Sequence, residues 1–308
     1  MSEATTIRAE ASVQDIETAQ KSAAARLSIA AAAFLIVLKT VTGLLTGSIS
    51  VWASLLDSAM DIFASTINYF AVRAAARPPD DDHAYGHGKV ESLAGLFQSF
   101  VITVSGLFLV RAAIGRISNP PATSAELLGV AVMLIATFVS IALVARLRRV
   151  ARQTDSPALS ADALHYATDV YTNGGALGAL LLLRLTGWRL ADPIISIAIS
   201  LYILASAISV ARDSIDVLMD KRLPLEVDEQ IAQIVGRFRT QGVVGHHDVR
   251  TRRSGAQKFI DLHLEVERNQ SLEAAHALSV QVLRAIEAEI PRSRVQIHTD
   301  PAGDNSDE

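Results

Sequence analysis

Residues Val51–Val72 read VWASLLDSAMDIFASTINYFAV, an apolar stretch interrupted by two aspartates. A helix that rises about 1.5 Å per residue needs about 20 such residues to cross a hydrocarbon core of roughly 30 Å. The stretch does not alternate between apolar and polar residues, which a membrane-spanning strand would require. It therefore predicts a transmembrane helix.

Five further stretches of similar length and composition lie elsewhere in the chain. The full set of six is Leu27–Thr46, Val51–Val72, Leu93–Ala113, Leu127–Ala145, Ala161–Leu185 and Pro193–Ala211. Half of the residues are hydrophobic and 19% are charged, and the mean hydropathy of +0.31 is high for a soluble domain. The apolar residues are gathered in these stretches, which decides the class. The predicted fold class is an integral membrane α-helical protein with six transmembrane helices, within residues 26–212.

Composition excludes several functional classes. The net charge of −4 and the isoelectric point of about 6.1 give no reason to expect nucleic acid as a partner. The chain has no cysteine, which excludes disulfides and thiolate metal sites. Residues 1–25 are mostly polar and lack the apolar core of a signal peptide, so they predict a cytoplasmic N-terminal tail.

Lysine and arginine residues at the ends of the six stretches and between them set the expected orientation. If the N-terminus lies inside, 11 of them fall on the inner side and four on the outer side. The positive-inside rule therefore favours a cytoplasmic location for both termini. Arg111 and Arg116, between the third and fourth stretches, are the one conflict.

Beyond Arg212 the chain changes character and predicts a cytoplasmic α/β domain over residues 213–301. The expected elements, in the order αββαβ, are a helix at Leu225–Thr240, strands at Val243–Arg252 and Lys258–Glu267, a helix at Leu272–Glu289 and a strand at Arg294–Thr299. Ser254-Gly255 is a hairpin signal between the first two strands. Residues 302–308 are acidic and predict a disordered tail.

Four ligand-type residues lie inside two of the predicted transmembrane helices. They are Asp57 and Asp61 in the second, and His165 and Asp169 in the fifth. Each pair is spaced i, i+4 and so shares one helical face. Three unpaired carboxylates at mid-bilayer would cost on the order of 8–10 kcal/mol, and a bound cation removes that cost. Three carboxylates and one imidazole suit tetrahedral Zn²⁺; the alternative is that these groups are protonated or hydrogen-bonded and only hold helices together. Lys39 in the first helix is expected to snorkel or to form an ion pair.

Two further clusters contain the remaining histidines. The loop between the second and third helices contains Asp80, Asp81, Asp82, His83 and His87, with Gly86 and Gly88 as helix breakers. The cytoplasmic domain contains His246, His247, Asp248, His263, His276, His298 and Asp300. All eight histidines of the chain fall into these two clusters or the membrane site, which favours metal binding over isolated surface histidines.

Four motifs in this order give the chain a resemblance to the cation diffusion facilitator family, and to its bacterial zinc and ferrous-iron efflux branch. The motifs are Leu-Asp-Ser-Ala-Met-Asp at Leu56–Asp61, Asp-His-Ala-Tyr-Gly-His-Gly-Lys-Val-Glu at Asp82–Glu91, Ala-Asp-Ala-Leu-His-Tyr-Ala-Thr-Asp at Ala161–Asp169 and Ile-His-Thr-Asp-Pro at Ile297–Pro301. The resemblance extends from Arg26 to Pro301.

The resemblance implies three metal sites and a charged interlock between protomers. The transport site would consist of Asp57, Asp61, His165 and Asp169, and the loop site of Asp80, His83 and His87, with Asp81 and Asp82 as alternatives for the aspartate. The cytoplasmic site would consist of His247, His263, His276, His298 and Asp300, with Asp248 nearby. The interlock would pair Lys89 with Asp220. Asp82 stands where the related motif often has a neutral amide, which adds negative charge to the loop.

The resemblance also implies a homodimer in the bilayer of a bacterial inner membrane, which exports a divalent cation by alternating access in exchange for protons. Zn²⁺ is expected as cargo and as a structural or regulatory ion, with no organic cofactor; imidazole with carboxylates would also accept Fe²⁺, Cd²⁺, Co²⁺ or Ni²⁺. Metal in the cytoplasmic cluster is expected to favour the transporting state. The alternatives are a passive divalent-cation channel and a membrane-embedded metal-dependent hydrolase. An enzyme is not expected, because the chain has neither His-Glu-x-x-His nor Gly-x-Ser-x-Gly.

Overall fold

The computed structural model describes residues 3–46, 49–118, 127–188 and 190–303. Within those ranges, the side chains of residues 3–14, 46, 49–53, 56, 57, 118 and 127 lie outside the description. The chain forms two compact units, which divide between Ile215 and Asp216.

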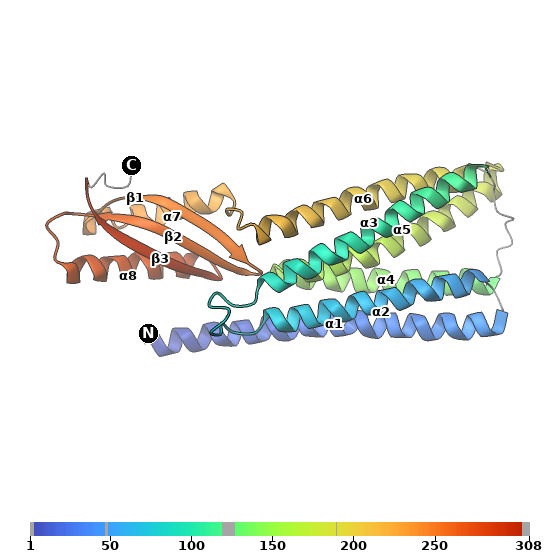
Figure 1. The fold of residues 1–308 in the computed structure, drawn as a ribbon, viewed down its shortest axis with the longest axis horizontal. Helices are drawn as coiled ribbons and strands as arrows, with labels where there is room; N and C mark the ends of the chain where they lie inside the picture. The colour runs from blue at the N-terminus through green and yellow to red at the C-terminus, as the bar shows by residue number, and fades with distance from the viewer. Residues whose placement is uncertain (1–2, 47–48, 119–126, 189, 304–308) are drawn as a thin grey trace. The chain divides into compact units, whose positions relative to one another are not determined.

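Six long helices build the first unit (Figure 1). They are α1 (Glu3–Thr46), α2 (Ile49–Ala75), α3 (Lys89–Ser118), α4 (Leu127–Thr154), α5 (Pro157–Thr186) and α6 (Ala191–Leu218). Among the described residues, α1, α3, α4 and α6 contain segments long and apolar enough to cross a membrane. Helices α2 and α5 are 27 and 30 residues long, and they carry the polar residues of the predicted transport site. The predicted six-helix membrane domain is confirmed.

The helices extend beyond the apolar stretches that predict them. Helix α1 begins at Glu3, so residues 3–25, expected as a tail, are helical and continuous with the first apolar stretch. Helix α4 continues past Ala145 to Thr154. Hydropathy marks only the apolar part of a helix, whereas Ala, Glu, Gln, Lys and Arg also favour helix outside the bilayer. Helix α5 begins earlier than predicted because Ser156 caps it, accepting a hydrogen bond from the Leu159 N–H at 3.3 Å.

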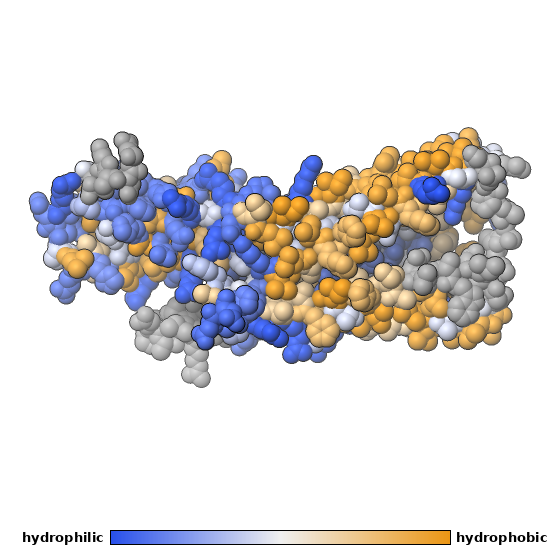
Figure 2. Space-filling model, viewed as in Figure 1, coloured by the Kyte–Doolittle hydropathy of each residue, from blue (hydrophilic) through white to orange (hydrophobic). Residues whose placement is uncertain are grey.

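Small residues allow the helices of the first unit to pack closely. Helix α1 packs against α2 and α4, and α5 packs against α4 and α3. Buried members of this core include Ala24, Ala25, Leu147, Ala158 and Ala163. Association in lipid depends on such close packing, because no hydrophobic effect drives helices together there. Large apolar side chains lie on the outside instead, and Figure 2 shows hydrophobic residues over much of the visible face of these helices.

The second unit has the predicted order αββαβ. Its elements are α7 (Leu225–Gly236), a 3₁₀ turn η1 (Arg239–Gln241), β1 (Val243–Ser254), β2 (Gln257–Val266), α8 (Leu272–Glu289) and β3 (Ser293–Pro301). The sheet order is β1-β2-β3, with β1 and β2 antiparallel and β2 and β3 parallel. Helix α7 ends four residues before the predicted Thr240, where the chain tightens into η1 and reaches Gly242 at φ +107°.

The two faces of this sheet have different roles. Ile260, Leu262, Leu264 and Val266 of β2 are 0–4% exposed and pack with residues of α7 and α8. Side chains alternate along a strand, so His263 lies on the opposite face. The predicted disordered tail, residues 302–308, lies outside the described residues from 304 onwards.

Candidate metal sites

Two of the four predicted transport residues are in contact between α2 and α5. His165 Nε2 lies 2.8 Å from Asp61 Oδ1, and the two side chains are 12% and 10% exposed. A buried imidazole and carboxylate at this distance are two ligands that a tetrahedral metal ion would use. A shared proton satisfies the same pair when no metal is bound.

The other two predicted ligands follow the same helical faces. Asp57 lies one helical turn before Asp61 on α2, and its side chain lies outside the described part of the structure. Asp169 lies one turn after His165 on α5 and is half-buried. The structure therefore brings His165 and Asp61 together, and the full set of four ligands stays a prediction.

Asp162 is a buried carboxylate to which sequence reasoning assigned no role. It is fully buried and accepts hydrogen bonds from Ser28 Oγ at 2.7 Å and Ser65 Oγ at 3.5 Å. Ser65 Oγ also lies 2.9 Å from the Tyr166 hydroxyl, which donates to the Ser28 carbonyl at 3.2 Å. These contacts join α1, α2 and α5 beside His165. The signal was available, because Asp162 precedes His165 by three residues and so lies on the same helical face.

Lys39, expected to snorkel or to form an ion pair, turns toward α2 and forms hydrogen bonds there. Its Nζ donates to the Ser54 carbonyl at 3.1 Å and to Ser58 Oγ at 2.7 Å. Ser54 and Ser58 flank Asp57 in the sequence. A positive charge therefore lies within about one helical turn of the predicted transport site.

A buried ion pair joins three helices at the start of α3. Lys21 Nζ of α1 lies 2.8 Å from Glu91 Oε1 of α3, with side chains 11% and 3% exposed. The hydroxyl of Ser156, the cap of α5, donates to the other oxygen of Glu91. Lys21 belongs to the segment predicted as a tail, which explains why sequence reasoning missed this contact.

The loop between α2 and α3 brings three predicted ligands together. Asp80 Oδ1 lies 3.2 Å from His83 Nδ1, and Asp80 Oδ2 lies 3.3 Å from His87 Nε2. One ligand atom from each residue falls within 4.8 Å of the others. Asp81 and Asp82, the alternatives for the aspartate, are exposed and do not belong to this group.

Local backbone geometry builds this loop. Gly86 has φ +79°, and its N–H donates to the His83 carbonyl at 2.8 Å, a turn that favours glycine. The His83 N–H donates to Asp80 Oδ1 at 2.7 Å, and this hydrogen bond lowers the pKa of Asp80 below its ordinary value of 3.8. Asp80 therefore carries its charge at neutral pH.

The sheet of the second unit aligns three histidines in one row. His247 pairs with His263 across β1 and β2, and His263 pairs with His298 across β2 and β3. Asp300, two residues after His298 on β3, lies close to all three histidines. Its Oδ2 is 2.9 Å from His263 Nδ1 and 3.7 Å from His247 Nε2, and its Oδ1 is 3.1 Å from His298 Nε2. Atoms of His247, His263 and Asp300 lie within 4.8 Å of one another, as a bound ion requires.

A bulge in β1 brings Asp248 to the edge of this row. The register shifts between His247 and Arg250, and Asp248 has φ +45°. A bulge re-aims a side chain, and Asp248 Oδ2 lies 3.8 Å from His263 Nε2. The bulge thus adds a second carboxylate to the predicted cytoplasmic site.

His276 is the predicted cytoplasmic ligand that the structure keeps apart from the rest. It lies exposed on α8, whereas α8 packs against the apolar face of the sheet and the histidine row lies on the other face. Within one chain His276 therefore lies apart from the row, and its part in the cytoplasmic site stays a prediction. His246 also lies outside the row, opposite Leu264, and burial lowers its pKa.

The two residues of the predicted interlock lie in different units. Lys89 begins α3 in the first unit. Asp220 follows α6 in the second unit, where its Oδ1 lies 3.5 Å from Arg252 Nη1. Their pairing between protomers stays a prediction.

Comparison with known proteins identifies relatives of both units. The cation efflux transmembrane domain matches residues 25–219, and the cytoplasmic domain of cation efflux proteins matches residues 223–302. The cation-efflux pump FieF of Klebsiella pneumoniae (strain 342) is 43% identical over 281 residues, which cover 91% of this chain and 93% of that protein. FieF of Yersinia pestis (strain Pestoides F) is 42% identical over 279 residues, covering 91% and 92%.

Among solved structures, the metal-bound C-terminal domain of the CzcD transporter from Thermotoga maritima is 30% identical. The match covers 26% of this chain and 93% of the CzcD domain, with a TM-score of 0.25. The two domain matches together span the membrane helices and the sheet domain, and the FieF relatives align over nearly their whole length. The chain belongs to the cation efflux family, the cation diffusion facilitators, and is a divalent metal cation efflux transporter rather than an enzyme.

Proposed function

We propose that this transporter exports Zn²⁺ in exchange for protons, through a site formed by Asp57, Asp61, His165 and Asp169. The observation that carries the proposal is the buried contact between His165 Nε2 and Asp61 Oδ1 at 2.8 Å. An imidazole among carboxylates suits Zn²⁺, whereas a set of oxygens alone would favour Mn²⁺. The FieF relatives are named cation-efflux pumps, which agrees with export.

Proton exchange follows from the chemistry of these ligands. Zn²⁺ binds a neutral imidazole and ionised carboxylates, so each proton on His165 or Asp61 removes a ligand. Metal and protons therefore exclude each other at one set of atoms. If the site opens first to one side and then to the other, metal leaves in one direction and protons return in the other.

The proposed orientation has both termini on the cytoplasmic side of a bacterial inner membrane.

The sheet domain is proposed to hold Zn²⁺ at the row of His247, His263, His298 and Asp300, and the loop to hold another ion at Asp80, His83 and His87. A homodimer fits the position of His276, because an exposed residue on α8 can reach a histidine row only on a second copy of the chain. Lys89 and Asp220 are the proposed interlock of that dimer. Metal that binds the assembled sheet domains more tightly than the separated ones would stabilise the dimer.

Proton release on metal binding tests the proposed site. The protein for this titration carries His83→Ala, His87→Ala, His263→Ala and His298→Ala, so that the membrane site dominates binding. Calorimetry near pH 6.5 in buffers of different protonation enthalpy should show net proton release when Zn²⁺ binds, because the metal displaces the proton that His165 and Asp61 share. Adding His165→Gln should remove most of this release. Equal proton release with and without His165 would refute the assignment of the site.

A further inference from the structure

Helix α5 has two faces with different chemistry. Each residue of a helix turns the direction of the side chain by about 100°, so His165 and Asp169 share one face with Asp162. The opposite face carries a second set of residues, whose successive spacings of four, seven and three residues keep them on one side of the helix. They are Ser160, Leu164, Tyr171 and Gly174. The transport site does not use this second face.

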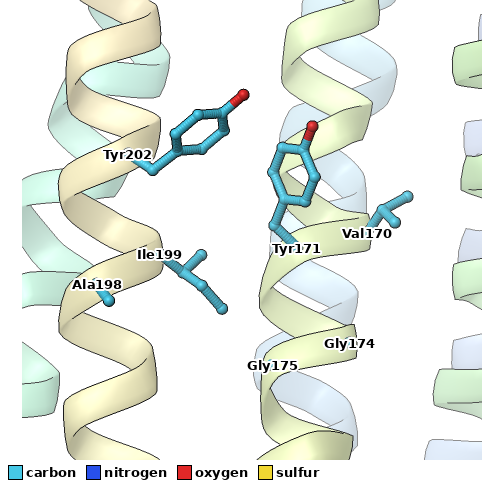
Figure 3. A pocket seen from close by; sticks show the side chains of 7 residues that line it. All are labelled: Val170, Tyr171, Gly174, Gly175, Ala198, Ile199 and Tyr202. Carbon is cyan, nitrogen blue, oxygen red and sulfur yellow. The ribbon is translucent and has the colours of Figure 1, made fainter.

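An apolar cavity of about 510 Å³ opens on this second face, between α5 and α6. Figure 3 shows the rings of Tyr171 and Tyr202 facing each other across it, with Gly174, Gly175 and Ile199 further along the same helices. The two rings make an edge contact at 5.4 Å between centroids. Gly174 leaves space there, because a Cβ on it would meet nothing within 4 Å, whereas a Cβ on Gly175 would clash with Ile199 Cδ1.

A second cavity of about 350 Å³ lies along the same two helices, toward the start of α5, and its lining is more polar than that of the first. Its lining includes Arg148 and Arg152 of α4, Ser160 of α5, and Ser206 and Ser209 of α6. Arg148 Nη2 donates to the Tyr171 hydroxyl at 3.5 Å and so links the polar cavity to the apolar one. Neither arginine forms an ion pair with any residue that the structure describes.

The two cavities together form a groove with the polarity of a phospholipid. Ser160 and Gly174 are separated by roughly 20 Å along α5, at about 1.5 Å per residue. One leaflet, including its headgroups, is about 20 Å thick. The arginines would lie at the depth of a headgroup phosphate, and the gap beside Gly174 at the depth of an acyl chain.

We propose that this groove, formed by α4, α5 and α6, binds one anionic glycerophospholipid. The phosphate lies at Arg148 and Arg152 with hydrogen bonds from Ser160, Ser206 or Ser209, and an acyl chain lies against Gly174 and Ile199. Basic pockets between transmembrane helices favour anionic headgroups, and Arg binds phosphate in bidentate fashion. In the proposed orientation this is a lipid of the cytoplasmic leaflet. The groove shares no residue with the proposed metal sites, so either proposal can fail alone.

Native mass spectrometry of the purified transporter, with phosphatidylglycerol and phosphatidylethanolamine added in equal amounts, tests the headgroup end. The wild type should retain phosphatidylglycerol in preference. Arg148→Gln with Arg152→Gln should weaken that binding about 30-fold, since each basic charge near an anionic surface contributes about fivefold. Arg146→Gln with Arg149→Gln is the matched control: it removes two exposed arginines of the same helix that do not line the groove. Equal retention of both lipids, or equal loss in both double variants, would overturn the proposal.

A glycine pair tests the acyl-chain end. Added Cβ atoms at Gly174 and Gly178 meet nothing within 4 Å, so leucine at either position is compatible with the fold, and only Gly174 lines the groove. Gly174→Leu should reduce phosphatidylglycerol retention at least tenfold, and Gly178→Leu should leave it unchanged. The native chain has no cysteine, so Gly174→Cys introduces a single one. A disulfide between two copies of that variant in native membranes would show that protein fills the groove, and would also overturn the lipid assignment.

Discussion

Single buried charges set the chemistry of the membrane domain. Asp61 meets His165, Asp162 is held by hydroxyl groups of α1 and α2, and Lys39 is held by Ser58 near the proposed ligands. Three ionised carboxylates and one divalent ion leave a net charge of −1, which the ammonium group of Lys39 would neutralise. Charge balance of this kind lowers the cost of ions within a bilayer.

Lys39→Gln should tighten Zn²⁺ binding at pH 8 by at least about tenfold, because a repelling charge near the metal is removed. The measurement is a Zn²⁺ titration of protein that also carries His83→Ala and His263→Ala, which weaken the loop and sheet sites. Ser58→Ala is the control, since it removes a hydrogen bond of Lys39 and keeps the charge. Unchanged or weaker binding in Lys39→Gln would show that the charge does not act on the site.

Protonation of Asp80 should not set the pH at which the loop site releases metal. A lowered pKa favours the ionised carboxylate, so Asp80 gains its proton only below its ordinary value of 3.8. Asp80→Asn should weaken Zn²⁺ binding at the loop at least about tenfold, and the pH at which the association constant falls to half of its high-pH value should stay the same. A shift of that midpoint by one pH unit would contradict this account. Asp81→Asn, next to it and outside the group, should change neither value.

At this scale, helical spacing and the family resemblance identified residues that lie together in the structure. The i, i+4 pairs led to Asp61 and His165, and the resemblance led to His247, His263 and His298. Sequence reasoning missed Asp162 and Glu91, because their partners come from helices whose packing no sequence spacing reveals. It did not reveal that His276 lies apart from the row within one chain, because the spacing within α8 does not say which face of the sheet the helix covers.

At the scale of elements, a buried ion pair and a hydrogen bond hold the start of α3 in addition to apolar packing. Glu91 contacts both Lys21 of α1 and Ser156 at the cap of α5. Removing one partner of a buried ion pair leaves an uncompensated charge, whereas removing both is far less costly.

Glu91→Gln and Lys21→Met should each destabilise the transporter, by about 3–5 kcal/mol in the limit of full burial. The double variant should lose much less than the two losses together. Thermal unfolding in detergent, monitored by size-exclusion chromatography, gives the unfolding midpoints of the wild type, the two single variants and the double variant. Lys89→Met, at the start of α3, serves as a comparison. Additive losses would show that the two charges act independently.

The row of histidines across β1, β2 and β3 is the element that suits regulation. His263→Ala with His298→Ala should reduce the dependence of dimer stability and transport rate on Zn²⁺ concentration, and should leave maximal transport above half of the wild-type value. His246→Ala is the matched control on β1, because His246 lies outside the row. Unchanged dependence on Zn²⁺ in the double variant would argue against a regulatory site.

Element boundaries show where local sequence decides. Helix α8 was predicted at its observed bounds, because Ser271 caps it by accepting from the Ala274 N–H at 3.2 Å and its apolar spacing is regular. The beginning of α1 could not be predicted from hydropathy, since residues 3–25 are mostly polar. The bulge at Asp248 gave no signal, because a non-glycine residue at positive φ is uncommon.

At the scale of the whole molecule, the six apolar stretches and the αββαβ order were enough to predict both units. Both are confirmed, and the family matches divide in the same way. The proposed division of work assigns metal and proton exchange to the membrane unit and metal-dependent stabilisation to the sheet unit.

Zn²⁺ flux into proteoliposomes under an imposed pH gradient tests the central claim, with wild type and Asp61→Asn compared at equal protein density. The proposed exchange predicts saturable wild-type flux that rises with the pH gradient and collapses when a protonophore abolishes that gradient. In Asp61→Asn, the flux should fall to the background of empty vesicles. Flux that is indifferent to the gradient, or that survives in Asp61→Asn, would contradict proton exchange through this site.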